Sequence, residues 1–233
     1  SAYGPSLAIS YSYASASVSL SKSSIKYGDS VMVTPSTDPV QTSGTMTLQY
    51  SANRVSWNNI ASQTGGTYTY AWQPPSAGTF YVRAQWSLSW TGGSYTATSA
   101  MPTLIVDKGD SSIETSLSRN SITATESVTL TATLSPRASD GTITFQYSRD
   151  RSTWAIISSG TPNAGVFTYS WTPRAVGTYY LRAIWSGNIN YKSATSSSQT
   201  LSVGLARTAI TLSAPASAKL DETIAITATL RDS

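Results

Sequence analysis

The chain has no cysteine and no histidine among its 233 residues. Without cysteine it can form neither a disulfide nor a thiolate nucleophile, and cysteine usage gives no indication of a redox compartment. Without histidine it lacks the commonest general base, and the two absences together remove the usual zinc ligands. We therefore expect no cofactor, no metal site and no enzymatic activity.

Charge and long apolar runs are also scarce. Charged residues make up 11% of the chain, and the net charge is +4 at pH 7. The basic residues are scattered rather than clustered among aromatics, so we expect no nucleic-acid partner. No apolar run approaches the roughly 20 residues of a transmembrane helix, so we expect no membrane span within this chain. The carboxylates are few and fall in predicted loops, unlike the rigid carboxylate pair of a glycosidase.

Aromatic and hydroxyl residues are abundant instead, with 14 tyrosines and 7 tryptophans, and they favour β-structure. The stretch Gly-Thr-Phe-Tyr-Val-Arg-Ala-Gln-Trp-Ser at 78–87 returns as Gly-Thr-Tyr-Tyr-Leu-Arg-Ala-Ile-Trp-Ser at 177–186. In each copy the apolar residues alternate with polar ones, which predicts a strand with one buried face. The residues predicted to point inward are Phe80, Val82, Ala84 and Trp86, and then Tyr179, Leu181, Ala183 and Trp185.

The repetition extends well beyond this stretch. Trp57 and Trp154 lie 97 residues apart, as do Leu104 and Leu201. Other positions predicted to point inward match in character between the two repeats. Met46, Leu48 and Tyr50 correspond to Ile143, Phe145 and Tyr147. Tyr68, Tyr70 and Trp72 correspond to Phe167, Tyr169 and Trp171. Strands of the first repeat are predicted at 17–21, 30–35, 45–51, 55–61, 67–72, 79–86 and 95–106. Seven short strands separated by turn signals predict a β-sandwich of about 100 residues.

We therefore predict an all-β chain of tandem sandwiches. The expected divisions are an N-terminal arm at 1–16, a first domain at 17–106, a second at 107–204 and a partial third repeat at 205–233. The third copy aligns 209–213 with 114–118 and 222–230 with 126–134, and then stops after two strands. Two strands with one apolar face cannot form a sandwich alone. Either the sequence is cut from a longer array or another chain completes the half-domain.

The N-terminal arm has its own alternating pattern, with Leu7, Ile9, Tyr11 and Tyr13 on one face. It can be an edge strand of its own domain. It can also add to a sheet edge of a neighbouring molecule, where main-chain hydrogen bonds give affinity. In that case the partial third repeat, with Ile210, Leu212, Ile224 and Ile226 as its apolar contacts, is the expected acceptor.

The motif Gly-x-Tyr-x-Leu/Val-Arg-Ala-x-Trp-Ser, followed by Asn188-Ile-Asn-Tyr191 and the closing Leu201-Ser-Val203, resembles the last strands of bacterial-type Ig-like repeats. Such repeats occur in tandem in bacterial and archaeal surface proteins. The resemblance covers nearly all of 17–203. It implies tandem immunoglobulin-like β-sandwiches and an extracellular or cell-surface location, but it names no ligand, because one fold serves many functions.

Three features lie outside the shared core. Trp90 is predicted in a longer, glycine-flanked loop without a counterpart in repeat two, where it can contact a neighbouring copy, pack on its own domain or stack on a surface glycan. Arg83 and Arg182 recur beside Tyr81 and Tyr180, which suggests a cross-strand ion pair or Arg–Tyr stacking. Asp107, Asp110 and Glu114 could hold calcium in a linker, but the next linker has no such acids.

We therefore predict a structural component of a surface assembly, such as a fibre, filament, stalk or S-layer-like protein, whose partners are copies of itself or neighbouring Ig-like repeats. Strand donation through residues 7–13 is the specific joining mechanism that we expect. The alternatives are an adhesin or glycan-binding module with Trp90 as its contact, and a spacer of a larger secreted enzyme.

Overall fold

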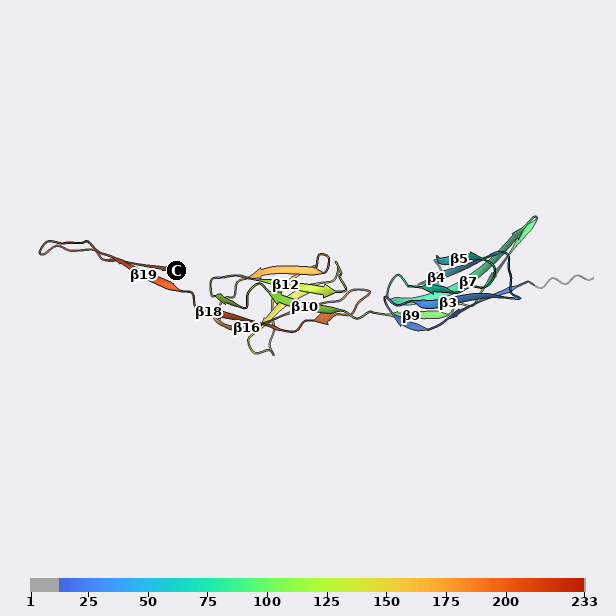
Figure 1. Cartoon of the computed structure of the whole chain (residues 1–233), viewed down its shortest axis with the longest axis horizontal. Coiled ribbons are helices and arrows are strands. Elements are labelled where there is room, and N and C mark those ends of the chain that lie inside the picture. Colours follow the sequence, from blue (N-terminus) through green and yellow to red (C-terminus); the bar gives the residue numbers. More distant parts are fainter. Residues whose placement is uncertain (1–12, 233) are drawn as a thin grey trace, which may run out of the picture. The chain divides into compact units, whose positions relative to one another are not determined.

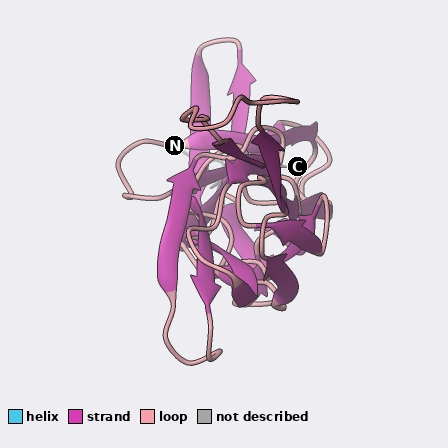
Figure 2. Ribbon diagram, turned by 90° about the vertical axis from the view of Figure 1, so that its left-hand side faces the viewer, coloured by secondary structure: helices cyan, strands magenta, loops and turns pink. Residues whose placement is uncertain are grey.

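The computed structural model describes residues 13–232, which form strands and loops without a helix (Figure 2). Accordingly, no helix long and apolar enough to cross a membrane occurs in this part of the chain. The chain divides into two compact units. One comprises Ser1–Asp110 with Ile189–Tyr191, and the other comprises Ser111–Asn188 with Lys192–Ser233.

The first unit is a sandwich of two sheets (Figure 1). Its strands are β1 (Ser15–Leu20), β2 (Ser24–Lys26), β3 (Val31–Asp38), β4 (Thr45–Ser51), β5 (Asn58–Thr64), β6 (Tyr70–Trp72), β7 (Gly78–Trp90), β8 (Gly93–Thr98) and β9 (Thr103–Asp107). One sheet has the order β1-β3-β6. The other has the order β2-β9-β7-β4-β5, with β8 paired to β7. All pairings are antiparallel except that of β2 with β9.

The second unit repeats this arrangement. Its strands are β10 (Ser112–Leu117), β11 (Ser121–Thr123), β12 (Val128–Ser135), β13 (Ile143–Ser148), β14 (Ala155–Gly160), β15 (Val166–Trp171), β16 (Gly177–Trp185), β17 (Ala194–Thr195) and β18 (Gln199–Gly204). The sheets are β10-β12-β15 and β11-β18-β16-β13-β14. Leu20 lies opposite Val33 in the first unit, and Leu117 lies opposite Leu130 in the second, so the registers agree at a spacing of 97 residues.

The predicted inward faces of β7 and β16 are confirmed, because all eight residues are at most 4% exposed. The indole of Trp86 donates to the Ser43 carbonyl at 3.0 Å, and that of Trp185 donates to the Asp140 carbonyl at 3.1 Å. A buried tryptophan thus satisfies its polar atom on a turn backbone in both repeats. The predicted all-β fold of immunoglobulin-like sandwiches is confirmed.

Several details of the strand prediction are wrong. The strand expected at 55–61 is β5 (Asn58–Thr64), and the strand expected at 67–72 is only β6 (Tyr70–Trp72). The expected strand 95–106 is two strands, β8 and β9, because Ser99 turns the chain between them: its buried hydroxyl accepts from Ala84 N at 2.9 Å and donates to Ala100 O at 2.6 Å. The short strand β2, and its counterpart β11, were not predicted. Each has three residues and pairs in parallel with a closing strand, so it is too short to show a period.

The prediction that Tyr70 and Tyr169 are buried on the inward face is also wrong in degree. Both side chains are more than a third exposed, because β6 and β15 are the outer strands of their sheets. Alternation along a strand says which face a residue is on, but not whether the facing sheet reaches far enough to cover it.

Candidate functional site

Tyr13 and Trp90, two of the residues singled out in the sequence, line the same groove of the first unit. Tyr13 stacks on Tyr95 with ring centroids 4.5 Å apart, and the Tyr95 hydroxyl donates to the Ala14 carbonyl at 3.3 Å. Trp86 lies on the other side of Tyr95, at a centroid distance of 6.3 Å. The groove has a volume of about 500 Å³, and Leu88 and Gln41 complete its lining.

Trp90 does not lie in an open loop, as the sequence suggested. It is the last residue of β7 and pairs with Gly93 of β8, so the extra residues of repeat one extend a β-hairpin. A Cβ on Gly93 would lie 3.0 Å from the Trp90 ring, which shows that the ring lies against this glycine. Even so, Trp90 is 52% exposed and Tyr13 is 65% exposed. The groove therefore has two aromatic side chains that are largely exposed to solvent.

The chemistry of this groove is that of recognition. Among the described residues its lining consists of aromatic rings, two aliphatic side chains and one amide, and the tyrosine hydroxyls are the only titratable groups in it. Aromatic faces of this kind bind apolar surfaces or the C–H faces of sugars. Leu7, Ile9 and Tyr11, the other predicted contacts of the arm, lie outside the described residues.

The remaining candidates lie on a separate hairpin of β19 (Thr208–Ser213) and β20 (Thr227–Asp232). Ile210 lies opposite Leu230, as Ile113 lies opposite Leu134 in the second repeat. The structural equivalent of Ile210 is therefore Ile113, 97 residues earlier, and the sequence alignment of 209–213 with 114–118 is two residues out of register. A shift of two preserves the face on which each side chain lies, so the alternating pattern could not reveal the error.

The apolar face of this hairpin is exposed. The equivalent positions of the second repeat, which are Ile113, Thr115, Val128 and Leu130, are at most 6% exposed. In the hairpin the corresponding Ile210, Leu212, Ile224 and Ile226 are between 44% and 72% exposed. Ile224 and Ile226 precede β20 rather than lying in a strand. A face that is core in one copy is thus open to solvent in the next.

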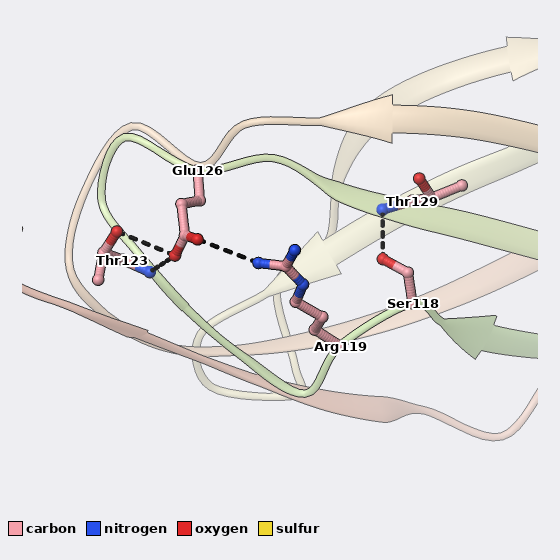
Figure 3. A network of polar contacts seen from close by, with 5 residues as sticks. All are labelled: Ser118, Arg119, Thr123, Glu126 and Thr129. Atoms are coloured by element: carbon pink, nitrogen blue, oxygen red, sulfur yellow. Dashed lines mark hydrogen bonds and ion pairs between the residues drawn. The ribbon is translucent and has the colours of Figure 1, made fainter.

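An acidic turn recurs three times at the start of the repeats and was not singled out in the sequence. Glu126 accepts hydrogen bonds from the Thr123 backbone N–H at 2.7 Å and from the Thr123 hydroxyl at 3.0 Å, and it pairs with Arg119 (Figure 3). These bonds hold the pKa of Glu126 below its ordinary value.

The same turn occurs in the other two copies. Asp29 accepts from Lys26 N at 3.3 Å, and Glu222 accepts from Lys219 N at 2.8 Å. An acidic side chain bonded to the backbone three residues earlier is a local device that needs no sandwich around it. The third copy therefore forms its first turn although its sheet face is uncovered.

The outward arginines stack on tryptophan rather than on tyrosine. The guanidinium of Arg83 lies over the Trp57 ring, with its Cζ 4.0 Å from the centroid, and its Nε donates to Gln49 at 2.8 Å. Burial lowers the pKa of Arg83. The neighbouring Tyr81 is covered by Arg54 instead, again at 4.0 Å. The predicted Arg–Tyr stacking was right in kind, but it assigned the wrong arginine to the tyrosine.

The linker acids are taken up by ordinary contacts in the structure. Asp110 forms an ion pair with Lys26, and Asp107 accepts a hydrogen bond from Ser24 at 3.2 Å. Within residues 13–232 no group of three or more acidic side chains is placed to hold a metal ion.

Comparison with known proteins identifies the repeat. Residues 115–204 match the family model of the bacterial Ig-like domain (group 3). A search of curated proteins finds no match. Among solved structures the chain is similar to a tetra-tandem repeat in the extending region of a large adhesion protein, with a TM-score of 0.51 and 16% identity. The alignment covers 94% of this chain and 56% of that one. The predicted resemblance to bacterial Ig-like repeats is confirmed for residues 115–204, and the similarity to a tandem repeat is confirmed at the level of the fold.

Proposed function

We propose that this chain, a tandem of Ig-like sandwiches that includes a bacterial Ig-like domain, is a structural segment of an extracellular or cell-surface assembly. The repetition of one architecture, with the same register in successive copies, supports a role as a structural spacer. The observation that carries the proposal is the β19–β20 hairpin, whose strand pairing and acidic turn are those of a sandwich and whose core face is uncovered.

The occupant of that face is a sheet of the same kind as β11-β18-β16-β13-β14. In the second unit, β16, β17 and β18 of this sheet contact β10, and the inward side chains of β10 and β12 are buried. Burial of a leucine or isoleucine side chain contributes about 1.5–3 kcal/mol, so four or more such residues strongly favour a covered state. The hairpin is therefore the first part of a sandwich whose remaining strands come from further Ig-like sequence or from a second copy.

A single donated strand would not cover the apolar face of the β19–β20 hairpin. A strand placed beside β20, as β15 lies beside β12, would extend the hairpin sheet but would leave its apolar face in water. The N-terminal arm keeps the repeat spacing of 97 residues. Leu7 and Ile9 lie 97 residues before Leu104 and Val106 of the first repeat. Leu104 and Val106 in turn lie 97 residues before Leu201 and Val203 of the second. By sequence, the arm thus has the pattern of a closing strand, the kind that lies next to β11 and β16 in the second unit.

Electron microscopy and sedimentation of the purified chain, with and without residues 1–15, test completion by another copy. Concentration-dependent assembly that is lost in a Leu212→Ser/Ile226→Ser variant, but kept in Leu220→Ser, supports it. Leu220 is a matched control, because it lies on the same hairpin but outside the inward set and is 94% exposed.

Completion by further sequence is tested by appending a second copy of residues 136–204 after residue 233. We expect an additional cooperative unfolding transition and slow amide hydrogen exchange in β19 and β20. If the hairpin amides exchange as fast in the extended chain as in the original, and the original chain does not assemble, the structural proposal is wrong.

A second candidate function is recognition through the groove of Tyr13 and Trp90. The observation that favours it is the exposure of two aromatic side chains in one groove of the first unit. A titration of tryptophan fluorescence with a broad panel of neutral sugars tests it. A shift that disappears in Trp90→Ala supports an adhesin role, and the absence of any shift argues for contact with a neighbouring Ig-like repeat.

A further inference from the structure

A second groove opens on the side of the second unit, between β14 and β15. Each of these strands is the outermost of its sheet, so the two sheets are not closed against one another there. The groove has a volume of about 510 Å³, which is within the range of small-ligand sites. No residue singled out in the sequence for binding lies in it.

The floor of the groove is aromatic. Tyr147 stacks on Trp171 with centroids 5.4 Å apart, and Tyr179 meets Trp171 edge to face at 5.2 Å. Tyr169 lines the groove with its ring more than a third exposed, and it takes part in no ring stacking among the described residues. Ring faces carry negative charge, which attracts the weakly positive C–H groups on one face of a sugar ring. Ser170 and Thr172 also line the groove, and the hydroxyl of Thr172 is hydrogen-bonded to that of Ser127 at 2.8 Å.

The groove also has a positive end. The exposed Arg174 lines it and, within residues 13–232, makes no hydrogen bond, ion pair or ring contact. Next to the groove, the guanidinium of Arg149 stacks on Tyr179 and donates to its hydroxyl at 2.6 Å. Among the described residues no aspartate or glutamate lines the groove, so its lining carries no negative charge opposite Arg174. An anionic group is the complement that such a lining lacks.

The first repeat shows that the core does not require these groups. Its equivalents of Ile156, Arg174 and Tyr179 are Asn59, Pro75 and Phe80, which provide neither the positive charge nor the hydroxyl. Trp72, the equivalent of Trp171, is only 5% exposed, whereas Trp171 is half-buried. The same sandwich is thus built without the cationic aromatic groove. The differences are concentrated on one open side of the second repeat.

We propose that this groove binds an acidic saccharide, with a sugar ring against Tyr169 and Trp171 and its carboxylate paired with Arg174. This site is independent of the structural role and of the Trp90 groove, which lies in the other unit. An extended peptide that adds to the free edge of β15 is the competing occupant.

Calorimetric titration of the whole chain with tetragalacturonate, and with its fully methyl-esterified form, tests the proposal. The ester keeps the sugar skeleton but removes the charge, so the acid should bind at least about tenfold more tightly, the value of one charge-assisted hydrogen bond. Sialyllactose and lactose provide a second matched pair. Equal affinity for acid and ester, or no binding of any acidic member, overturns the proposal.

Two variants locate the site. Arg174→Gln should weaken binding of the acid about tenfold and leave the ester unaffected, and Tyr169→Ala should weaken both. Arg207→Gln removes the same charge outside the groove, and Trp90→Ala alters the other groove, so neither should change the affinity. If Arg174→Gln and Arg207→Gln lose the same affinity for the acid, the acid is attracted non-specifically to a basic chain. If an extended peptide displaces the acid but the methyl ester does not, the groove binds by strand addition. Either result refutes the saccharide site, and unchanged circular dichroism excludes misfolding.

Discussion

The guanidinium of Arg182 lies over the Trp154 ring, its Cζ 3.9 Å from the centroid, as that of Arg83 lies over Trp57 in the first repeat. In both copies the arginine Nε also donates to a glutamine of the neighbouring strand, Gln146 or Gln49. The pair thus ties the central strand β16 or β7 to the strand and loop next to it, on the face away from the core.

We expect Arg182→Met to lower the stability of the second unit by about 1–2 kcal/mol, because the substitution keeps the aliphatic stem but removes the cation over Trp154 and the bond to Gln146. Urea denaturation followed by tryptophan fluorescence measures the effect. Arg207→Met serves as the control, since Arg207 has no ring contact among the described residues. An equal loss in both variants would show that the stacking does not contribute.

Gly141 should not tolerate a side chain. Its φ is +73°, and a Cβ there would lie 2.5 Å from the Gly187 carbonyl oxygen and 2.6 Å from Trp185 Nε1. We expect Gly141→Ala to cost about 2–4 kcal/mol, since it adds a steric clash to the strain of positive φ.

Gly28→Ala is the matched control for that substitution. Gly28 also has a positive φ, +98°, but no atom lies within 4 Å of a Cβ there. Gly28→Ala should therefore lower the free energy of unfolding by only about 1 kcal/mol. Thermal unfolding of the two variants separates the effect of backbone strain from that of the clash with Gly187 and Trp185. Equal shifts of the unfolding temperature in the two variants would contradict the clash.

Asp150 should make the second unit sensitive to acid. Its carboxylate accepts from the backbone N–H groups of Thr153 at 2.8 Å and Ser152 at 2.9 Å, and these bonds hold its pKa well below the ordinary value. A group whose pKa is lower in the folded state stabilises the fold above its unfolded-state pKa, and this contribution is lost as the pH falls. We therefore expect stability to decline with acidification below about pH 4.

The first repeat supplies the substitution that tests this. Asn53 stands in the place of Asp150 and accepts the same two backbone bonds, from Val55 and Ser56, each at 2.9 Å. Asp150→Asn should therefore keep the fold and flatten the decline between about pH 4 and pH 2. Denaturation of the original chain and the variant across that pH interval measures this effect. If the free energy of unfolding falls with the same slope in the variant, other carboxylates cause the acid sensitivity.

The two tryptophans of the β7 hairpin should behave differently. Trp86 is 3% exposed and packs in the core, so Trp86→Ala should cost about 3–5 kcal/mol. Trp90 is half-exposed at the hairpin end, so Trp90→Ala should cost less than about 1 kcal/mol. Unfolding midpoints compare the two variants. A large loss in Trp90→Ala would mean that its ring is part of the core rather than a contact surface.

Much of the fold could be predicted from the sequence because its signals are local. The alternation in 80–86 and 179–185 marks the buried faces of β7 and β16, and the 97-residue spacing marks two copies of one sandwich. Period two has a limit, however. It cannot distinguish registers that differ by two residues, which is why the third copy was misaligned, and it cannot detect the three-residue strands β2 and β11.

Contacts between distant parts of the chain could not be predicted in this way. The sequence marked Tyr13 and Trp90 separately, but the pairing of β7 with β8 and the stacking of Tyr13 on Tyr95 bring them into one groove. The outward arginines were noticed, yet the ring that each one covers depends on a loop more than 25 residues away.

The sequence by itself thus determined the class of fold, the number of repeats and the inward face of the main strands, because each follows from a pattern within a few residues or from one fixed spacing. Only the tertiary structure decided which of these faces are covered. Trp72 and Trp171 occupy the same place in equivalent strands, but Trp72 is 5% exposed and Trp171 is half-buried, and the sequence pattern does not distinguish them. The groove at Trp171 and Arg174 likewise exists only because the outer strands of two sheets leave it open.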